Sequence, residues 1–424
     1  MAVPARAWVV TGAGTAVNLC LGILYGWSVW NAALVNEARA GEPMTGLNEG
    51  WTYLDNVRGT VAYAVCGITF ALFMIPGGRL QDRYGAKIGA TLGGLFLAIG
   101  CIVAGLMKSF EGLVVGFGVL GGIGMGLGYA AATPAAVKWF HSSRRGLIVG
   151  LVVAGYGAAA VYISPLADYL ITNHGLTGSF VGLGIFFAVV VVIAGQLLSP
   201  PPPGFVAAAP SNVVEGPKLA ATNFGAGQML RTWQFYALVL LFIGSAQSGL
   251  LVISKAKTFL ADTAGKTGYF AERAWLLVTF IGVVNAIGRI GTGQYSDRIG
   301  RLNAYAINGL VSAACLLVAP WVLAEKNVLL LFVVIGVMAW QYGGTLAVLP
   351  ALTADYYGPK NLGLNYGLVF VGWGFAFFVP LVASSIKDRT GQWGGAFYLS
   401  AGLLVTAVLV SRIIRKPVSV APGA

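Results

Sequence analysis

Long apolar runs separated by short polar segments form the main pattern of this sequence. Each run holds about 20 residues or more, the length that a helix needs to cross roughly 30 Å of hydrocarbon. The ten-residue alternation of a transmembrane barrel does not recur along the chain. We therefore predict an all-α membrane protein with twelve transmembrane helices. The predicted spans cover about residues 8–34, 57–78, 86–108, 111–138, 146–172, 178–199, 233–259, 271–294, 302–323, 327–354, 363–386 and 393–414.

Two connections between the predicted spans are longer than the others. Residues 35–56 join the first two spans, and residues 200–231 divide the chain near its midpoint and open with a run of prolines. Such a run favours a stiff, non-helical linker. The pattern predicts an N-terminal six-helix bundle over 1–199, a cytoplasmic linker over 200–231 and a C-terminal six-helix bundle over 232–424.

Charged residues are scarce and mostly basic. They make up 9% of the chain, and the net charge is +12, whereas an average soluble domain has about 25% charged residues. In a membrane protein such an excess of Lys and Arg marks cytoplasmic loops, so we expect no nucleic-acid partner. With both termini inside, 15 of the 26 basic residues lie on the cytoplasmic side, ten lie outside and Arg289 remains within a span. We expect a multi-pass protein of the cell (cytoplasmic) membrane with cytoplasmic termini.

The residues that catalysis or metal binding requires are sparse. The four cysteines lie in apolar runs without metal-ligand spacing, and the two histidines lie at loop edges. No H-E-x-x-H or G-x-S-x-G motif occurs in the chain. We therefore expect no metal, no cofactor and no enzymatic activity.

A polar motif recurs in the two halves of the sequence. The segment GRLQDRYGAK, residues 78–87, follows the second predicted span, and GQYSDRIGRL, residues 293–302, follows the eighth. The offset of 215 residues is about half the chain length. Glycine permits a tight turn at such a place, and aspartate accepts charge-assisted hydrogen bonds from arginine. The matched charged residues are Asp82 and Asp297, and Arg83 and Arg298.

Twelve spans, a central linker and paired loops together resemble the major facilitator superfamily over essentially the whole chain. The resemblance implies two six-helix halves around a midplane cavity that opens alternately to each side. It also implies a gating role for the paired loops. The alternative is that their charges only set the topology. The repeated loops disfavour a channel, and a non-transporting sensor of the same fold stays open. The candidate gating residues are Asp82, Arg83, Asp297 and Arg298.

Arg289 is a basic residue in the middle of a predicted span. It precedes Arg298 by nine residues, which places it roughly 13 Å deeper at about 1.5 Å per residue. A guanidinium near the bilayer centre costs about 2.5–3.5 kcal/mol on insertion scales unless it meets water or a counter-charge. The apolar runs hold no Asp or Glu at comparable depth. We therefore predict an anionic substrate as its partner, because guanidinium binds carboxylate bidentately; the alternative is a structural arginine.

Asn285 and several aromatic residues accompany Arg289. Asn285 lies one helical turn earlier, so it shares a helix face with the arginine. We predict that it steadies the guanidinium or binds the substrate, with a structural interhelical amide as the alternative. Aromatic residues at this depth are individually more often packing residues, but as a set they would line a cavity for a small carboxylate.

Several local strings resemble one branch of the superfamily, the oxalate/formate antiporter family, which is similar to animal monocarboxylate transporters. They include YGWSVW, PGGRLQDRYG, AGYGAAA, NAIGRIGTGQYSDRIGR and GLNYG. The resemblance implies that Arg289 binds the substrate carboxylate and that Tyr25, Tyr129 and Tyr156 line the substrate cavity. The predicted substrate-binding set is Arg289, Asn285, Tyr25, Tyr129, Tyr156, Tyr342, Phe370 and Trp373.

The sequence differs from the oxalate carriers in the number of cations available to the substrate. Those carriers pair the span-eight arginine with a span-eleven lysine, but this chain has Trp373 there, and residues 361–386 contain no cation. Tyr342 and Phe370 fall where the oxalate carriers have tryptophan. A dianion would keep one charge uncompensated in a low-dielectric cavity. We predict a monocarboxylate such as lactate, pyruvate or formate, with an oxalate/formate-type anion exchanger as the alternative.

A second departure concerns protons. The animal transporters carry an acidic residue one turn before the span-eight arginine, where this chain has Asn285, and a lysine in span one, where residues 7–38 contain no Lys or Arg. Because asparagine does not titrate, we hypothesise that a proton travels on the substrate carboxylate. The prediction is a monomeric secondary transporter that moves a small carboxylate together with H+ by alternating access.

Overall fold

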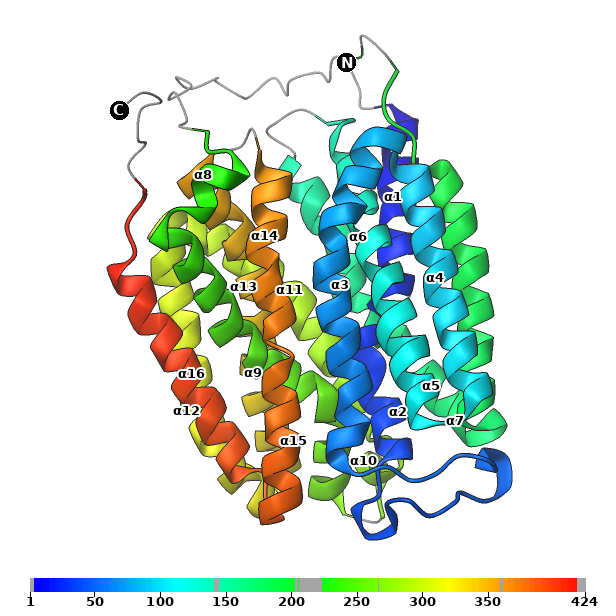
Figure 1. Ribbon diagram of the computed structural model, residues 1–424. Helices are drawn as coiled ribbons and strands as arrows, with labels where there is room; N and C mark the ends of the chain where they lie inside the picture. Colours follow the sequence, from blue (N-terminus) through cyan, green and yellow to red (C-terminus); the bar gives the residue numbers. More distant parts are fainter. Residues whose placement is uncertain are drawn as a thin grey trace.

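The described part of the chain is almost entirely helical. In the computed structural model the helices run roughly parallel to one another and form two groups that lie side by side (Figure 1). We call α1 to α7 the first helix group and α8 to α16 the second. The described residues are 4–140, 145–202, 205, 223–265, 267–358 and 361–417.

The first helix group contains 3-10 and π-helical elements besides its α-helices. Two short 3-10 helices, Glu37–Arg39 and Gly46–Asn48, lie in the connection between α2 and α3. A short 3-10 helix, Gly22–Gly26, links α1 to α2, and a π-helical stretch, Leu113–Gly121, links α5 to α6. The α-helices of this group are α1 (Ala5–Leu21), α2 (Trp27–Leu34), α3 (Asn56–Tyr84), α4 (Ala86–Met107), α5 (Phe110–Gly112), α6 (Gly122–Val137) and α7 (Arg145–Leu197).

The second helix group begins after the central segment of the chain. Its helices are α8 (Ala226–Leu230), α9 (Trp233–Ala264), α10 (Tyr269–Glu272), α11 (Leu276–Ile299), α12 (Arg301–Ala324), α13 (Val328–Tyr357), α14 (Leu362–Phe375), α15 (Phe378–Thr390) and α16 (Gly394–Ile413).

Eleven helical segments of the described residues are long and apolar enough to cross a membrane, which confirms the predicted all-α membrane protein. The predicted number of twelve is not confirmed. The difference lies in α7, where Ile148–Leu197 forms one 50-residue segment over two predicted spans. The backbone of α7 is non-helical at Gly175, with φ 71° and ψ 178°. The count of twelve and the cytoplasmic position of the termini stay predictions.

Gly175 is the point where α7 meets the long connection between α2 and α3. A Cβ at this position would lie 2.4 Å from the carbonyl oxygen of Leu47, so the backbone needs glycine both for its positive φ and for this close approach. The amide nitrogen of Leu176 donates to Asn48 Oδ1 at 2.7 Å, and Trp51 Nε1 donates to Thr177 Oγ1 at 3.0 Å. The connection is thereby fastened to the helix bundle, and we call this end of the bundle the 35–56 end (bottom of Figure 1).

The internal repeat of the sequence is also present in the backbone. Gly85 and Gly300, which occupy the same position in the two copies of the motif, have φ of 88° and 90°. Because both lie in the left-handed region, they make the tight turns that the motif predicts. The repeat extends further, since Lys108 and Lys326 also match, with φ of 48° and 53° at an offset of 218 residues (326 − 108).

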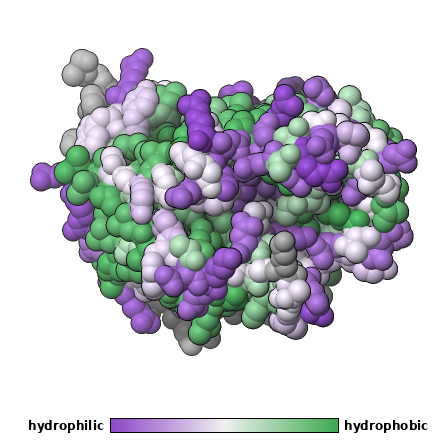
Figure 2. All heavy atoms as spheres, turned by 90° about the horizontal axis from the view of Figure 1, so that it is seen from below, coloured by the Kyte–Doolittle hydropathy of each residue, from purple (hydrophilic) through white to green (hydrophobic). Residues whose placement is uncertain are grey.

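The outer surface of the helices is apolar. Large exposed side chains on it include Leu95 and Ile99 of α4 and Leu409 and Ile413 of α16. Figure 2 looks onto the 35–56 end and shows hydrophilic side chains spread across it. An apolar flank with a polar end is the distribution that a helical protein needs in a bilayer.

Candidate functional site

Arg289 lies on α11 between the two helix groups and is 8% exposed. Its Nε donates to Asn285 Oδ1 at 3.0 Å, and one Nη donates to the carbonyl oxygen of Val153 on α7 at 3.2 Å. The other Nη donates to the hydroxyl of Tyr25 at 3.3 Å. A guanidinium has five N–H donors, and these three bonds do not use all of them.

Two glycines let the segment around Arg289 approach its neighbours closely. A Cβ at Gly157 on α7 would lie 2.8 Å from Asn285 Oδ1, and a Cβ at Gly343 on α13 would lie 2.2 Å from the carbonyl oxygen of Asn285. Helix α11 therefore packs against one helix of each group at this level. Small residues permit such approaches between membrane helices, and here they hold the arginine at the boundary between the groups.

Asn285 is fully buried and, as the helical spacing predicts, it bonds to Arg289. Its Oδ1 accepts from the guanidinium, which leaves Nδ2 as a donor. Among the described residues Nδ2 has no hydrogen-bond partner. An unpaired buried donor carries a desolvation cost of about 1–3 kcal/mol, so this amide has a bond to offer to a ligand that reaches Arg289.

The six predicted aromatic residues form a closed ring of contacts. Five of the contacts join ring centroids that are 5.0–6.4 Å apart, and the sixth is a hydrogen bond from Trp373 Nε1 to the hydroxyl of Tyr342 at 2.8 Å. Each helix group contributes three members, so the ring spans the boundary. In order around the ring they are Tyr25, Tyr156, Tyr129, Phe370, Trp373 and Tyr342.

A chain of hydroxyl groups connects this aromatic ring to the guanidinium. Tyr25 accepts from Arg289, and its hydroxyl lies 2.8 Å from the hydroxyl of Tyr342, which in turn accepts from Trp373. The structure thus brings all eight predicted substrate-binding residues into one cluster. Their role in binding stays a prediction.

Phe70 belongs to the same cluster but was not predicted from the sequence. This α3 side chain is 1% exposed, and its ring centroid lies 5.0–5.8 Å from those of four members of the aromatic ring, two from each helix group. It therefore fills the space beside the ring. In the sequence Phe70 is one apolar residue within an apolar run, and no local signal distinguishes it.

No carboxylate pairs with Arg289 in the part of the chain that the structure describes. Asp168 and Asp355 both lie within spanning helices, and each pairs elsewhere: Asp168 with Lys257, and Asp355 with Arg301 at 2.8 Å. Among the described residues Arg289 therefore lacks a protein counter-charge, and anion binding at this guanidinium stays a prediction.

Lys255 on α9 is a second buried cation that sequence reasoning missed. The sequence places it toward the end of a span, where a lysine can reach the surface. In the structure it is only 1% exposed, and its Nζ donates to Asn31 Oδ1 at 3.0 Å and to Asn56 Oδ1 at 3.3 Å. Hydropathy alone could not identify these partners, because both belong to the other helix group.

In the second motif, Asp297 forms an ion pair with an arginine of the same segment. Asp297 pairs with Arg301 at 3.1 Å, one turn further along, and not with Arg298, which is exposed. Arg301 also pairs with Asp355 on α13, so it links α12 to two neighbouring segments. The turn at Gly300 brings the end of α11 and the start of α12 together, which places Arg301 beside Asp297.

In the first motif only part of the predicted gating pair is described. Arg83 is exposed, and its guanidinium lies 5.3 Å from the centroid of the Tyr84 ring. The side chain of Asp82 lies outside the described residues. A gating role for either motif stays a prediction.

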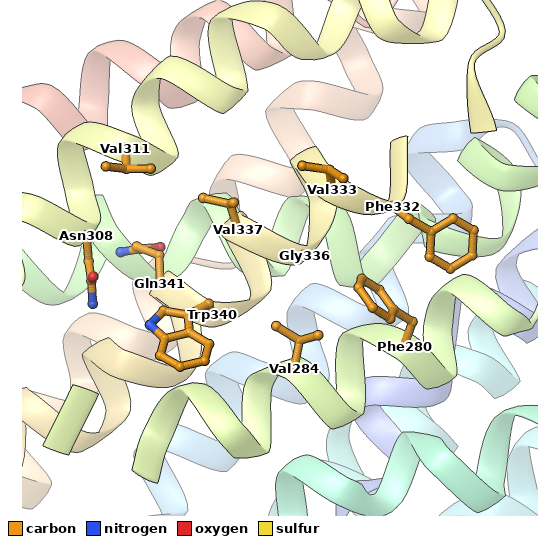
Figure 3. Close-up of a pocket in the computed structure, with 10 residues that line it drawn as sticks. All are labelled: Phe280, Val284, Asn308, Val311, Phe332, Val333, Gly336, Val337, Trp340 and Gln341. Carbon is orange, nitrogen blue, oxygen red and sulfur yellow. The ribbon is translucent and has the colours of Figure 1, made fainter. Parts of the chain in front are cut away.

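A cavity of about 400 Å³ lies apart from this cluster, among α11, α12 and α13 (Figure 3). Its lining is mostly apolar, with Asn308 and Gln341 as polar exceptions, and it contains no cation. None of the eight predicted residues lines it. It therefore does not provide the anion site that the arginine predicts.

Comparison with known proteins identifies the class to which this fold belongs. The sequence profile of the Major Facilitator Superfamily matches residues 50–324 and 274–424. The chain belongs to the Major Facilitator Superfamily and is a multi-pass membrane transporter, not an enzyme. This confirms the resemblance seen in the paired loops.

Three relatives show which transporters the chain is similar to. An uncharacterized MFS-type transporter, YhjX, of Escherichia coli is 28% identical over 85% of this chain and 83% of its own length. The oxalate:formate antiporter of Oxalobacter formigenes is 24% identical over 89% and 92%. Monocarboxylate transporter 12-B of Danio rerio is 25% identical over 79% and 74%.

Proposed function

We propose that this protein is a secondary active transporter of a small monocarboxylate of the lactate, pyruvate or formate type. The observation that supports this most is that unused guanidinium donors of Arg289 lie beside the free Nδ2 of Asn285. Two carboxylate oxygens match this set of donors, and charge-assisted bonds of this kind are the strong ones. The names of two relatives, an oxalate:formate antiporter and a monocarboxylate transporter, point to the same class of substrate.

The residues of the aromatic ring favour a substrate with one carboxylate over a substrate with two. Trp373 occupies the position implied for a second cation, and its indole donates to Tyr342 instead. The other buried cation, Lys255, is already bonded to two amide oxygens. Phe70, Phe370 and Trp373 supply an apolar surface that suits the methyl end of a small acid.

Transport proceeds in this proposal by alternating access of two bundles, residues 1–199 and 232–424, joined by the 200–231 linker. The protein acts as a monomer in the cytoplasmic membrane, its termini are cytoplasmic, and the 35–56 end faces outside. The motif residues Asp82, Arg83, Asp297 and Arg298 take part in gating at the cytoplasmic end.

The charge of Arg289 makes the conformational change easier for the loaded carrier than for the empty one. A bound carboxylate neutralises the guanidinium. Expelling water from the loaded site therefore costs less free energy than expelling it from the empty site. Arg289 lies on α11 of the second helix group and donates to Val153 of the first, so a ligand bound to it contacts the boundary between the groups. The loaded carrier is therefore the one that changes conformation readily.

The second candidate function is an oxalate/formate-type anion exchanger. Its support is the relative named oxalate:formate antiporter, which covers 89% of this chain. Against it stands the absence of a second cation among the residues that form the aromatic ring.

A counterflow panel tests the proposed function. Purified protein in liposomes is preloaded in turn with lactate, pyruvate, formate, acetate and oxalate, and uptake of the same labelled acid is measured. We expect saturable counterflow of one or more monocarboxylates, with oxalate at least about tenfold slower, because a single cation compensates a single charge. Preferential counterflow of oxalate would favour the second candidate, and linear, non-saturating flux would contradict a carrier.

Proton coupling is a separate prediction. The residue one turn before Arg289 is asparagine, which does not titrate, so the proton is expected to cross on the substrate carboxylate. An inward proton gradient should therefore drive uptake of the monocarboxylate above its equilibrium level, and a proton ionophore should abolish the accumulation. Uptake in proteoliposomes at equal substrate on both sides, with only the pH differing, measures this. Uptake that ignores the gradient would leave exchange as the mode of transport.

A further inference from the structure

Lys255 is a buried cation for which the central site offers no role. The residue is 1% exposed, and among the described residues its ammonium is hydrogen-bonded only to the amide oxygens of Asn31 and Asn56. The ring of Trp393 lies beside it, 5.7 Å from Nζ to the centroid. No carboxylate lies within ion-pair distance of Nζ in the described part of the chain. A buried ammonium held only by neutral groups is costly, and a built-in cost of this kind calls for a functional explanation.

The partners of Lys255 belong to the opposite helix group. Asn31 lies on α2 and Asn56 begins α3, whereas Lys255 lies on α9. Both amides present Oδ1 to the lysine. Their nitrogens are used elsewhere: Asn31 Nδ2 donates to the carbonyl oxygen of Gly59 at 2.9 Å, and Asn56 Nδ2 donates to Asp388 Oδ1 at 2.9 Å.

Further bonds across the boundary show that this end of the protein is closed. The amide nitrogen of Val57 donates to Asp388 Oδ2 at 3.2 Å, and the hydroxyls of Thr60 and Ser384 are 2.7 Å apart. Every one of these bonds joins α3 to α15. If the 35–56 end opens, as alternating access requires, α2 and α3 move away from α9 and α15. Lys255 then loses both of its acceptors at once.

The position of Lys255 places it on the route from the 35–56 end to Arg289. On the same helix, a Cβ at Gly249 would lie 2.4 Å from Cγ of Tyr342, so this part of α9 touches the aromatic ring. Lys255 follows Gly249 by six residues, or about 9 Å along the helix axis. An anion that enters from this end meets the ammonium before it meets the guanidinium.

We propose that Lys255 is a second anion-binding residue, which captures the substrate carboxylate when the 35–56 end is open and releases it when Asn31 and Asn56 return. The proposal rests on the proposed transport of a carboxylate. Lysine suits a transient binding site, because its compact ammonium on a flexible stem exchanges partners easily. The planar guanidinium of Arg289 suits a fixed site that binds a carboxylate bidentately.

The carboxylates around Lys255 bear on this role. Asp388 and Glu37 do not contact the ammonium directly. Both accept hydrogen bonds from Nδ2 of Asn56, and this amide lies between them and Lys255. Asp388 belongs to the same helix group as Lys255, so in the open state it competes with the substrate for the ammonium. Removing this competitor is therefore expected to leave substrate capture intact or to strengthen it.

The test compares the KM for uptake from the 35–56 side in variants that differ in one charge. In cells expressing the protein, with the acid that the counterflow panel selects, Lys255→Gln is expected to raise KM about tenfold while changing kcat by less than about threefold, because a charge-assisted bond is lost only in capture. Lys255→Arg keeps the charge and should keep KM within about threefold. Lys255→Met serves in place of the glutamine variant if the latter fails to insert.

Lys257→Gln is the matched control. Lys257 lies two residues further along α9 and pairs with Asp168, but its side chain is 20% exposed, so water already solvates its charge whether or not that pair is intact. Its removal should leave KM unchanged, and Asp388→Asn should leave KM unchanged or lower it. An unchanged KM in the Lys255→Gln protein, or an equal rise in the Lys257→Gln protein, would overturn the inference. Wild-type uptake in the same cells reports on the proposed function, whereas the ratio of the KM values reports on Lys255 alone.

Discussion

Arg289→Ala is expected to abolish carboxylate uptake while the protein still folds and inserts. The variant removes the only guanidinium in the predicted site, together with its unused N–H donors, so a bound carboxylate would have no counter-charge in a water-poor site. A loss of two charge-assisted bonds of about 1.5–3 kcal/mol each predicts a fall in uptake of at least about 100-fold. Initial rates in proteoliposomes with matched amounts of protein measure this.

Stability distinguishes this binding role from a structural one. The guanidinium makes three hydrogen bonds, but its insertion costs about 2.5–3.5 kcal/mol without a counter-charge. Because the two contributions oppose each other, the melting temperature of Arg289→Ala in detergent should stay within a few degrees of the wild-type value. A substrate that raises the melting temperature of the wild-type protein should leave that of the variant unchanged. A collapse of the variant's melting temperature would instead identify a structural arginine.

Arg289→Lys is the matched control. It keeps a positive charge at the same depth but loses the planar fork that bonds Asn285, Val153 and Tyr25 together. Uptake is expected to persist with a raised KM, because lysine offers a point charge in place of bidentate geometry. Activity equal to the wild type would show that charge alone suffices.

The features that could be predicted from the sequence are those set by local rules. Helical spacing placed Asn285 beside Arg289, and the structure confirms the bond at 3.0 Å. The repeated motif placed a glycine at each tight turn, and both Gly85 and Gly300 have a φ near 90°. The aromatic cluster was predicted through the resemblance to a family, because no periodicity relates tyrosines that are more than 300 residues apart.

The features that were missed depend on contacts between the two helix groups. By its sequence position Lys255 lies near a span end, yet in the structure Asn31 and Asn56 of the other helix group bind its ammonium. Phe70 gains its place in the cluster only because α3 packs beside α14. The sequence also does not show which arginine pairs with Asp297, and in the structure it is Arg301, beyond the turn at Gly300. In each case the deciding partner is distant in the chain or lies beyond a turn.

Trp373→Lys is expected to shift the preference from monocarboxylate toward oxalate. The indole lies in the aromatic ring, where Nε1 donates to the hydroxyl of Tyr342 at 2.8 Å, so a lysine from the same backbone position places its ammonium among the residues that surround Arg289. Two cations then face two carboxylates, and the uncompensated charge that excludes a dianion disappears. A gain of about 3 kcal/mol from one charge-assisted interaction predicts a change of about 100-fold in the ratio of kcat/KM for oxalate to that for lactate.

Counterflow of the two acids in the same liposomes measures this ratio, and Trp373→Met separates charge from size. Methionine removes the indole and enlarges the space beside Phe70 and Phe370 without adding a cation, so it should admit larger monocarboxylates and leave oxalate excluded. Because an unpaired ammonium is costly inside the ring, the lysine variant should also be less stable when empty and regain stability when oxalate binds. An equal gain of oxalate transport in both variants would show that the wild-type protein excludes the dianion by size and not by charge.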